Sequence, residues 1–370
     1  MIKIRWNALV ELWYPLVLGG LGLLIALSLM SWRLAGLTPG LSETEIATYN
    51  SANSVADIFD NALNGPYKIG IYLSTRVFNN AFGLRIVGAL IGVVTIGLFY
   101  LIAQKLLIMR NALITTVLFA TSSIFLHTTR LASPNVMLLS LLALVAIGAM
   151  VRFDKRTDLG WILASIIVAL SLYTPGIIIF VIIGALWQLR RVKKSFSNLS
   201  SDILIICAVI FSLLLAPLII SIIRDPALGA QLIGIPESLP NIKDFGESLL
   251  RIPSSIFAIS PDNPVYWLGR QPILDVFSIV MIIYGLISLF RQFRLERLVL
   301  FVGIFVLSSI WIAISGNHQA IIILIPFLYL IIGMGIQDFT DIWLAVFPRN
   351  PIARYTGLCL LIVAVALTVN

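Results

Sequence analysis

The chain has 370 residues, of which 59% are hydrophobic and only 11% are charged, and its mean hydropathy is +1.03. Soluble domains carry about 25% charged residues, so the ionisable side chains here are too few to cover a water-exposed surface. The composition therefore excludes soluble, disordered and fibrous proteins. We predict an all-α, polytopic membrane helix bundle.

The net charge of +8 is distributed in a way that predicts membrane orientation. Basic residues cluster between apolar runs, and we place all of these clusters on one side of the bilayer. By the positive-inside rule that side is cytoplasmic. We therefore expect a multi-pass plasma-membrane protein with a cytoplasmic N-terminus, membrane lipids around it and no nucleic-acid partner. The clusters lie at 3–5, 105–110, 152–156, 190–194, 291–297 and 349–354.

A spanning helix needs about 20 mainly apolar residues, and the sequence offers eleven candidate runs. Two of them flank Tyr173-Thr174-Pro175-Gly176 and are short, so they could form one kinked element. Two separate spans are favoured, because only then do the clusters at 152–156 and 190–194 share a face. The runs are 14–34, 85–106, 111–125, 134–151, 159–173, 175–189, 203–223, 273–290, 298–314, 320–336 and 355–369.

The remaining hydrophilic sequence forms two long loops in a single membrane domain, 1–370, and we place both loops on the external face. The first, 36–84, contains Ser42 and Glu45 at the spacing of a helix capping box. We expect amphipathic external helices in this loop, and we expect the helix that follows Ser42 to lie flat against the bundle or the headgroups. Its apolar residues at helical spacing are Ile46, Tyr49, Ala52, Ala56 and Phe59.

The second loop, 224–272, is rich in proline and carries Tyr266-Trp267. Two interpretations remain open for it. It could be an ordered lid or acceptor-binding loop, or a plain connection with interfacial aromatic residues. In the second span, Gly88 and Gly92 have the GxxxG spacing, which predicts close helix packing within the chain.

Several stretches resemble the GT-C-fold membrane glycosyltransferases. They are Asn64-Gly65-Pro66-Tyr67-Lys68-Ile69-Gly70-Ile71-Tyr72, Asn80-Ala81-Phe82-Gly83-Leu84-Arg85, Ser122-Ser123-Ile124-Phe125-Leu126-His127-Thr128-Thr129-Arg130, Leu172-Tyr173-Thr174-Pro175-Gly176 and Leu324-Ile325-Pro326-Phe327. The family includes protein O-mannosyltransferases and lipid A aminoarabinose transferases. The resemblance implies transfer of a sugar from a polyprenyl-phosphate donor to a protein, lipid or glycan acceptor.

The sequence departs from this family at its acidic motif. The family's Asp-Glu pair after the first span matches Thr44 and Glu45, so the Asp position is Thr here. Asn64-Gly65 also replaces a His-Pro pair, and His318-Gln319 stands where relatives often have Arg-Tyr. The chemistry is then either rebuilt on a neighbouring acid or reduced.

The resemblance and the chemistry together suggest site residues. Glu45 and Glu43 are the candidate bases, although both could simply cap a helix. Lys68 and Arg130 are the candidate ligands of the donor phosphate, and Arg85 is better interpreted as an anchor that snorkels to headgroups. Secondary candidates are Asp57, Asp60 and His318.

Metal and cofactor sites are not expected. His127 and His318 lack the spacing of a metal motif, and Cys207 and Cys359 lie in apolar runs and are interpreted as small buried hydrophobes. Two other functions compete with glycosyl transfer. One is a catalytically weak binding or assembly protein, which Thr44 favours, and the other is a lipid or solute transporter, which the nearly uncharged spans disfavour.

Overall fold

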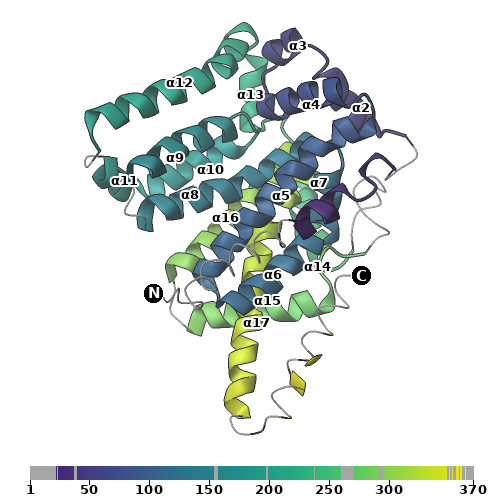
Figure 1. Ribbon diagram of the computed structural model, residues 1–370, viewed down its shortest axis with the longest axis vertical. Coiled ribbons are helices and arrows are strands. Elements are labelled where there is room, and N and C mark those ends of the chain that lie inside the picture. The colour runs from purple at the N-terminus through teal and green to yellow at the C-terminus, as the bar shows by residue number, and fades with distance from the viewer. Residues whose placement is uncertain are drawn as a thin grey trace, which may run out of the picture.

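A computed structural model describes residues 22, 24–36, 40–153, 157–196, 199–236, 238–259, 271–291 and 295–347, with 350, 352, 356–357, 359–360 and 363. This part of the chain is built from helices and contains no β-strand (Figure 1). The predicted all-α membrane bundle is thereby confirmed. The basic cluster at 3–5, the Tyr266-Trp267 pair and most of the run 355–369 lie outside the described residues.

The first predicted loop folds into short helices and leads into the bundle. Its elements are η1 (Leu34–Gly36), α2 (Glu43–Asn50), α3 (Val55–Asp60) and α4 (Gly65–Val77). The bundle continues with α5 (Ala81–Leu106), α6 (Met109–Thr121), α7 (Ser123–Arg130), η2 (Pro134–Leu139), α8 (Ser140–Phe153), α9 (Thr157–Ser171), α10 (Ile177–Trp187) and α11 (Leu189–Phe196).

The second half of the described chain is also helical. It contains α12 (Ser201–Arg224), α13 (Ala227–Ile233), α14 (Ile242–Phe257), α15 (Val276–Arg291), α16 (Leu295–Ser315), η3 (His318–Ile323) and α17 (Ile325–Val346). Each predicted apolar run between residues 85 and 336 overlaps one of these helices. The two runs around Tyr173 form separate helices, α9 and α10, as predicted.

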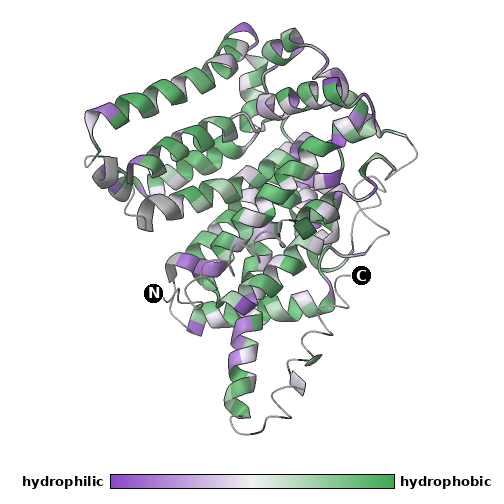
Figure 2. Cartoon of the chain, viewed as in Figure 1, coloured by the Kyte–Doolittle hydropathy of each residue, from purple (hydrophilic) through white to green (hydrophobic). Residues whose placement is uncertain are grey.

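Four helical segments of the described chain are long and apolar enough to cross a bilayer: α5, α12, 297–315 and 318–346. The pair α6 and α7, bent by 57°, would make a fifth. Helices α8, α9, α10 and α15 have 14, 15, 11 and 16 residues, short of the roughly 20 that a full crossing needs. Figure 2 shows hydrophobic colour along most of α9, α10 and α12.

The core is centred on α17, of which 94% of the most apolar window is buried. Two glycines let α15 and α17 touch backbone to backbone. A Cβ atom at Gly335 would lie 1.9 Å from the carbonyl oxygen of Met281, and one at Gly285 would lie 2.1 Å from that of Ile331. Similarly, Gly88 and Gly92 of α5 pack on Thr129, which confirms the predicted close packing within the chain.

Helices α2, α3, α4 and α13 gather at one end of the molecule (Figure 1). Ser221 of α12 ties this end together, because its hydroxyl donates to the carbonyl oxygen of Asp60 at 2.9 Å and accepts from the backbone N–H of Ala62 at 3.1 Å. A second apolar cluster lies beneath it. Its members are Ala62, Leu63, Tyr173, Leu218, Leu228 and Leu232.

The first loop contains several helices, as predicted, but the apolar residues from Ile46 to Phe59 do not belong to a single helix. The chain breaks between α2 and α3, where Ser54 caps α3 by accepting a hydrogen bond from the N–H of Asp57 at 3.1 Å. Of the expected apolar face, Ala52 is buried, whereas Ile46 is 46% exposed and Phe59 is 45% exposed, so these two side chains point away from the bundle. The face that packs against the bundle instead carries Glu45, which meets a cation there.

Candidate active site

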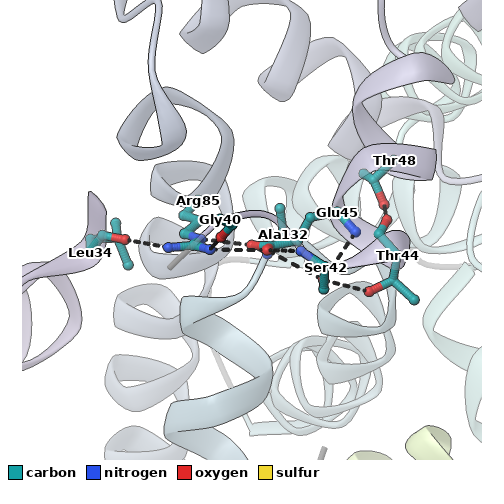
Figure 3. A network of polar contacts seen from close by, with 8 residues as sticks. All are labelled: Leu34, Gly40, Ser42, Thr44, Glu45, Thr48, Arg85 and Ala132. Carbon is teal, nitrogen blue, oxygen red and sulfur yellow. Dashed lines mark hydrogen bonds and ion pairs between the residues drawn. The ribbon is translucent and has the colours of Figure 1, made fainter. Parts of the chain in front are cut away.

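The centre of the end formed by α2, α3, α4 and α13 is a buried ion pair between α2 and α5. The Nε of Arg85 donates to Glu45 at 2.7 Å and its Nη2 donates at 3.0 Å, and both side chains are 0% exposed (Figure 3). The pair forms because the predicted capping box places Glu45 at the third position of α2, facing inward. Both reciprocal hydrogen bonds of that box are present.

Backbone groups from four segments complete this ion pair. The Arg85 guanidinium donates to the carbonyl oxygens of Leu34 at 3.0 Å and Gly40 at 3.3 Å. The Glu45 carboxylate accepts from the N–H of Ser42 at 3.0 Å and from that of Ala132 at 3.2 Å. Burial alone would raise the pKa of Glu45, but the hydrogen bonds from Arg85, Ser42 and Ala132 outweigh it and lower that pKa.

This geometry gives Glu45 and Arg85 a structural role. A carboxylate with a lowered pKa, no exposure and its oxygens occupied by donors is a poor acceptor for a substrate proton, which counts against Glu45 as the base. The expectation that Arg85 snorkels to headgroups is wrong, because its guanidinium is fully buried and paired.

Beside the ion pair lies a cavity of about 270 Å³. Its wall comes from α2, the α3–α4 connection, α4, η2, the α9–α10 connection and α13, so segments far apart in the sequence meet there. The polar lining residues are Thr48, Ser51, Asn61, Asn64, Tyr67, Lys68 and Gln231, and the apolar ones are Leu63, Pro134 and Pro175. The cavity brings Lys68 together with residues that sequence reasoning did not assign to a site.

Lys68 supplies the positive charge of the cavity. Its side chain is buried, its residue is 7% exposed, and its Nζ donates to the carbonyl oxygen of Asn61 at 2.7 Å. No carboxylate lies within ion-pair distance of this ammonium among the described residues. Desolvation by burial lowers the pKa of Lys68 to about 8. A buried ammonium with unused donors and no counter-ion is a binding point for an anion.

Polar atoms without partners surround this ammonium. In the described part of the chain, the Oδ1 of Asn64 and the hydroxyl of Tyr67, both from cavity-lining residues, are buried and make no hydrogen bond. The hydroxyl of Thr174, next to the lining residue Pro175, is in the same condition. Buried polar groups are normally paired, so these atoms indicate a ligand or ordered water in the cavity.

Helix geometry decides which residues of α2 face the cavity. Thr44, Thr48 and Ser51 are spaced i, i+4 and i+7, so they share one face, and the last two line the cavity. Glu43 is rotated by about 100° from Thr44 around the helix axis. It is exposed to solvent at the first turn of α2. Thr44 therefore lies on the same face of α2 as the cavity-lining Thr48, although it does not line the cavity itself.

The remaining predicted residues lie away from the cavity. Arg130 is half-buried at the end of α7, and its guanidinium donates to the carbonyl oxygen of Trp32. Asp57 is exposed, and Asp60 forms an exposed ion pair with Arg224 at 3.4 Å. His318 begins η3 and lines neither cavity described here. No group of three His, Cys, Asp or Glu side chains comes together for a metal in the described ranges.

A smaller cavity of about 20 Å³ adjoins the first across the Ser133-Pro134-Asn135 segment. Pro134 lines the large cavity, whereas Ser133 and Asn135 line the small one. The amide of Asn135 donates to Gln319, and its Oδ1 accepts from the Nδ2 of Asn317 at 3.0 Å. These amides connect η2 with η3, which the sequence did not predict because the two turns are about 180 residues apart.

Trp311 supports the part of the large cavity wall that Pro175 and Gln231 form. The ring of Trp311 in α16 fills the space beside Gly176 and Gly234, where an added Cβ would lie 2.2 Å from it. Both glycines have positive φ, at 82° and 83°. The Trp311 indole N–H donates to the carbonyl oxygen of Ile233 at 3.2 Å, and the N–H of Gly176 donates to that of Leu232 at 2.8 Å. The neighbouring residues Pro175 and Gln231 are thereby held at the cavity wall.

Comparison with known proteins identifies this architecture. The family model for dolichyl-phosphate-mannose-protein mannosyltransferases matches residues 65–220. The structure is similar to a crystal structure of ArnT from Cupriavidus metallidurans bound to undecaprenyl phosphate. The TM-score is 0.57 with 14% sequence identity, over 94% of this chain and 63% of that one. No curated protein matches the chain.

The chain has a GT-C fold. It spans about 63% of the length of ArnT. The family match begins at the first residue of α4, so it includes Lys68 and Arg85 and leaves out α2 with Thr44 and Glu45. The expected resemblance to GT-C membrane glycosyltransferases is confirmed at the level of the fold.

Proposed function

We propose that this GT-C chain is a membrane glycosyltransferase that takes a sugar from a polyprenyl-phosphate donor, with the donor headgroup in the large cavity. The observation that carries the proposal is the buried ammonium of Lys68, which has no carboxylate partner in the described chain and lies among unpaired polar atoms. The binding of undecaprenyl phosphate by a protein of the same fold adds support.

The cavity suits the departure of a phosphate. In the transfer, the acceptor oxygen forms a bond to the anomeric carbon while the bond from that carbon to the phosphate oxygen breaks. The phosphate keeps the electron pair, and the Lys68 ammonium stabilises the negative charge that develops on it. The acceptor proton must go to a base. We assign that role to Glu43, which is exposed at the start of α2, and we assign Glu45 to positioning through Arg85.

We place this reaction on the external face of the plasma membrane, because the positive-inside rule applied to the basic clusters predicts a cytoplasmic N-terminus. The first long loop, with α2, α3 and α4, is then external. Protein, lipid and glycan all remain acceptor classes for the proposed enzyme.

The test compares the binding of undecaprenyl phosphate to the wild-type chain and to Lys68→Met in lipid nanodiscs. We expect at least a tenfold loss of affinity, because a charged group that meets a phosphate in a buried site contributes a charge-assisted hydrogen bond. Lys243→Met is the matched control, since the Lys243 side chain is 86% exposed on α14. If wild type and Lys68→Met bind undecaprenyl phosphate with equal affinity, the donor phosphate does not bind at Lys68 in the large cavity.

A second function, a binding or assembly protein that holds polyprenyl phosphates without transferring sugar, is favoured by one observation. No side chain that lines the cavity in the described chain is a carboxylate, and Thr44 precedes the lining residue Thr48 by one helical turn. Lys68-dependent binding without glycosyl transfer to any acceptor class would select this alternative.

A further inference from the structure

The charged side chains that line the large cavity restrict which sugar the donor can carry. Lys68 is the cation of the lining, and no acidic side chain lines the cavity within the described ranges. A polyprenyl phosphate brings its own negative charge, which this ammonium can balance. After phosphate binding, the lining has no charged group left for the sugar.

The other polar lining groups are neutral and can both donate and accept hydrogen bonds. They are the amides of Asn61, Asn64 and Gln231 and the hydroxyls of Thr48, Ser51 and Tyr67. The unpaired Oδ1 of Asn64 requires a donor, and the unpaired hydroxyl of Tyr67 accepts either type of partner. A sugar hydroxyl is both donor and acceptor, so it satisfies either atom.

Charged sugars do not fit this arrangement. The ammonium of an amino sugar would be buried beside Lys68 with no carboxylate in the cavity lining, because the proposed base Glu43 lies outside that lining, and a like charge at short range disfavours binding. The carboxylate of a uronic acid would need a second cation. The cavity of about 270 Å³ has room for roughly nine water molecules at about 30 Å³ each, which suits a headgroup and excludes the isoprenoid chain.

We propose that the donor carries an uncharged, polyhydroxylated sugar, bound by the neutral amides and hydroxyls of the large cavity next to Lys68. This rests on the proposed function, because it assumes that the phosphate occupies the Lys68 ammonium. It separates the two kinds of donor found among GT-C enzymes that this sequence resembles, neutral hexoses and amino sugars, in favour of the first.

The test measures displacement of labelled undecaprenyl phosphate from the nanodisc-bound chain by four probes. These are the unlabelled carrier phosphate, the same phosphate bearing a neutral hexose, one bearing an amino sugar and one bearing a uronic acid. We expect the neutral hexose probe to bind at least tenfold more tightly than the amino-sugar and uronic-acid probes. Equal or tighter binding of either charged probe would overturn the inference.

Two carboxylate variants test the cause of the preference. Gln231→Glu and Asn64→Asp each add a negative charge to the lining with little change in size, so each should tighten the amino-sugar probe at least fivefold relative to the neutral one. Gln231→Met is the matched control, which should weaken the neutral probe without favouring the amino sugar. If neither carboxylate variant changes the ratio, the charge argument is wrong.

The carrier phosphate without sugar keeps the two proposals distinguishable. Lys68-dependent binding of this probe, together with no discrimination among the sugars, would leave the proposed function in place and reject the neutral-sugar inference. Absence of Lys68-dependent binding of the carrier phosphate would reject both.

Discussion

The Glu45–Arg85 ion pair holds α2 against α5 at the end of the molecule that contains the large cavity. Its two charges are fully buried and 40 residues apart in the sequence, and their backbone partners come from both sides of α2. A buried ion pair contributes little more to stability than well-packed apolar residues of similar volume would. Removing only one partner, however, leaves the other charge buried without compensation. The consequence is a sharp difference between single and double variants.

Replacing Glu45→Gln should therefore destabilise the chain by about 3–5 kcal/mol, because Arg85 remains charged and buried. Thermal unfolding in detergent, followed by tryptophan fluorescence, measures the change. The double variant Glu45→Gln/Arg85→Met removes both charges and should recover a large part of the loss. Because the pKa of Glu45 is lowered, its contribution is complete at neutral pH and is lost as the pH falls below the ordinary glutamate pKa. A single variant as stable as wild type would contradict this role.

Lys68 should make anion binding depend on pH. The pKa of Lys68 is lowered to about 8, so the ammonium is present below that pH and is lost as the pH rises through it. A phosphate monoester is already fully ionised there, since its second pKa is about 6. We expect undecaprenyl phosphate to bind about tenfold more weakly at pH 9 than at pH 7.

The matched variant for this measurement is Lys68→Arg. A guanidinium stays protonated over the whole range, so binding by this variant should be nearly independent of pH. Equal pH dependence in Lys68→Arg and wild type would show that another group is responsible.

Glu43 is the residue to test for proton transfer. Glu43→Gln should lower the rate of glycosyl transfer by about 10²–10⁴-fold while binding of the carrier phosphate stays unchanged, because a general base acts in the chemical step. Asp57→Asn is the control, since Asp57 is also an exposed carboxylate near the start of a short helix. Full transfer activity in Glu43→Gln would exclude it as the base.

At the scale of elements, the contact of Trp311 with two glycines holds the α9–α10 connection and α13 at the cavity. Gly234→Ala adds a Cβ that would lie 2.2 Å from the indole, at a φ of 83° that alanine rarely adopts. We expect at least a tenfold loss of affinity for undecaprenyl phosphate in nanodiscs, because Gln231 and Pro175 move from the cavity wall.

The control is Gly303→Ala on α16, the helix that carries Trp311. An added Cβ at Gly303 has no atom within 4 Å, and alanine favours a helix over glycine. This variant should bind the carrier phosphate as wild type does. If Gly234→Ala also binds normally, the tryptophan contact does not position the cavity wall.

At the scale of the whole molecule, the charge distribution predicts which ends of the helices share a side of the membrane. Single cysteines at Lys243 on α14 and at Lys193 on α11 are exposed positions for labelling. In a background without Cys207 and Cys359, a membrane-impermeant thiol reagent applied to intact cells should label position 243 and leave position 193 unlabelled until the cells are lysed. The reverse pattern would invert the proposed orientation.

The features that the sequence predicted are those set by local residue order. The capping box at Ser42, the apolar runs and the packing of Gly88 and Gly92 each depend on spacing within a single helix. The partner of Arg85 could not be predicted in this way, because an arginine at a helix start fits a headgroup anchor equally well. The outward turn of Ile46 likewise follows from the buried charge of the preceding residue, Glu45, which sets the rotation of α2.

The cavity was beyond prediction for a related reason. Lys68 could be selected from the family resemblance, but Gln231 comes from another loop and Pro175 from a break between helices. Their meeting depends on how Trp311 packs, which no spacing in the sequence encodes. The partnerless atoms of Asn64 and Tyr67 are likewise visible only in three dimensions.

The wall formed by Ser133, Pro134 and Asn135 has a thermodynamic consequence for both cavities. One side of this segment faces the large cavity, and the other side joins the amides of Asn317 and Gln319. A headgroup that shifts Pro134 must alter the hydrogen bonds of Asn135. The small cavity, at about 20 Å³, has room for one water molecule. If that water changes the affinity of the large cavity for an anion, linkage requires the anion to change the affinity for the water by the same factor. The wall is thus a place where water in one cavity and an anion in the other are coupled through the same few amides.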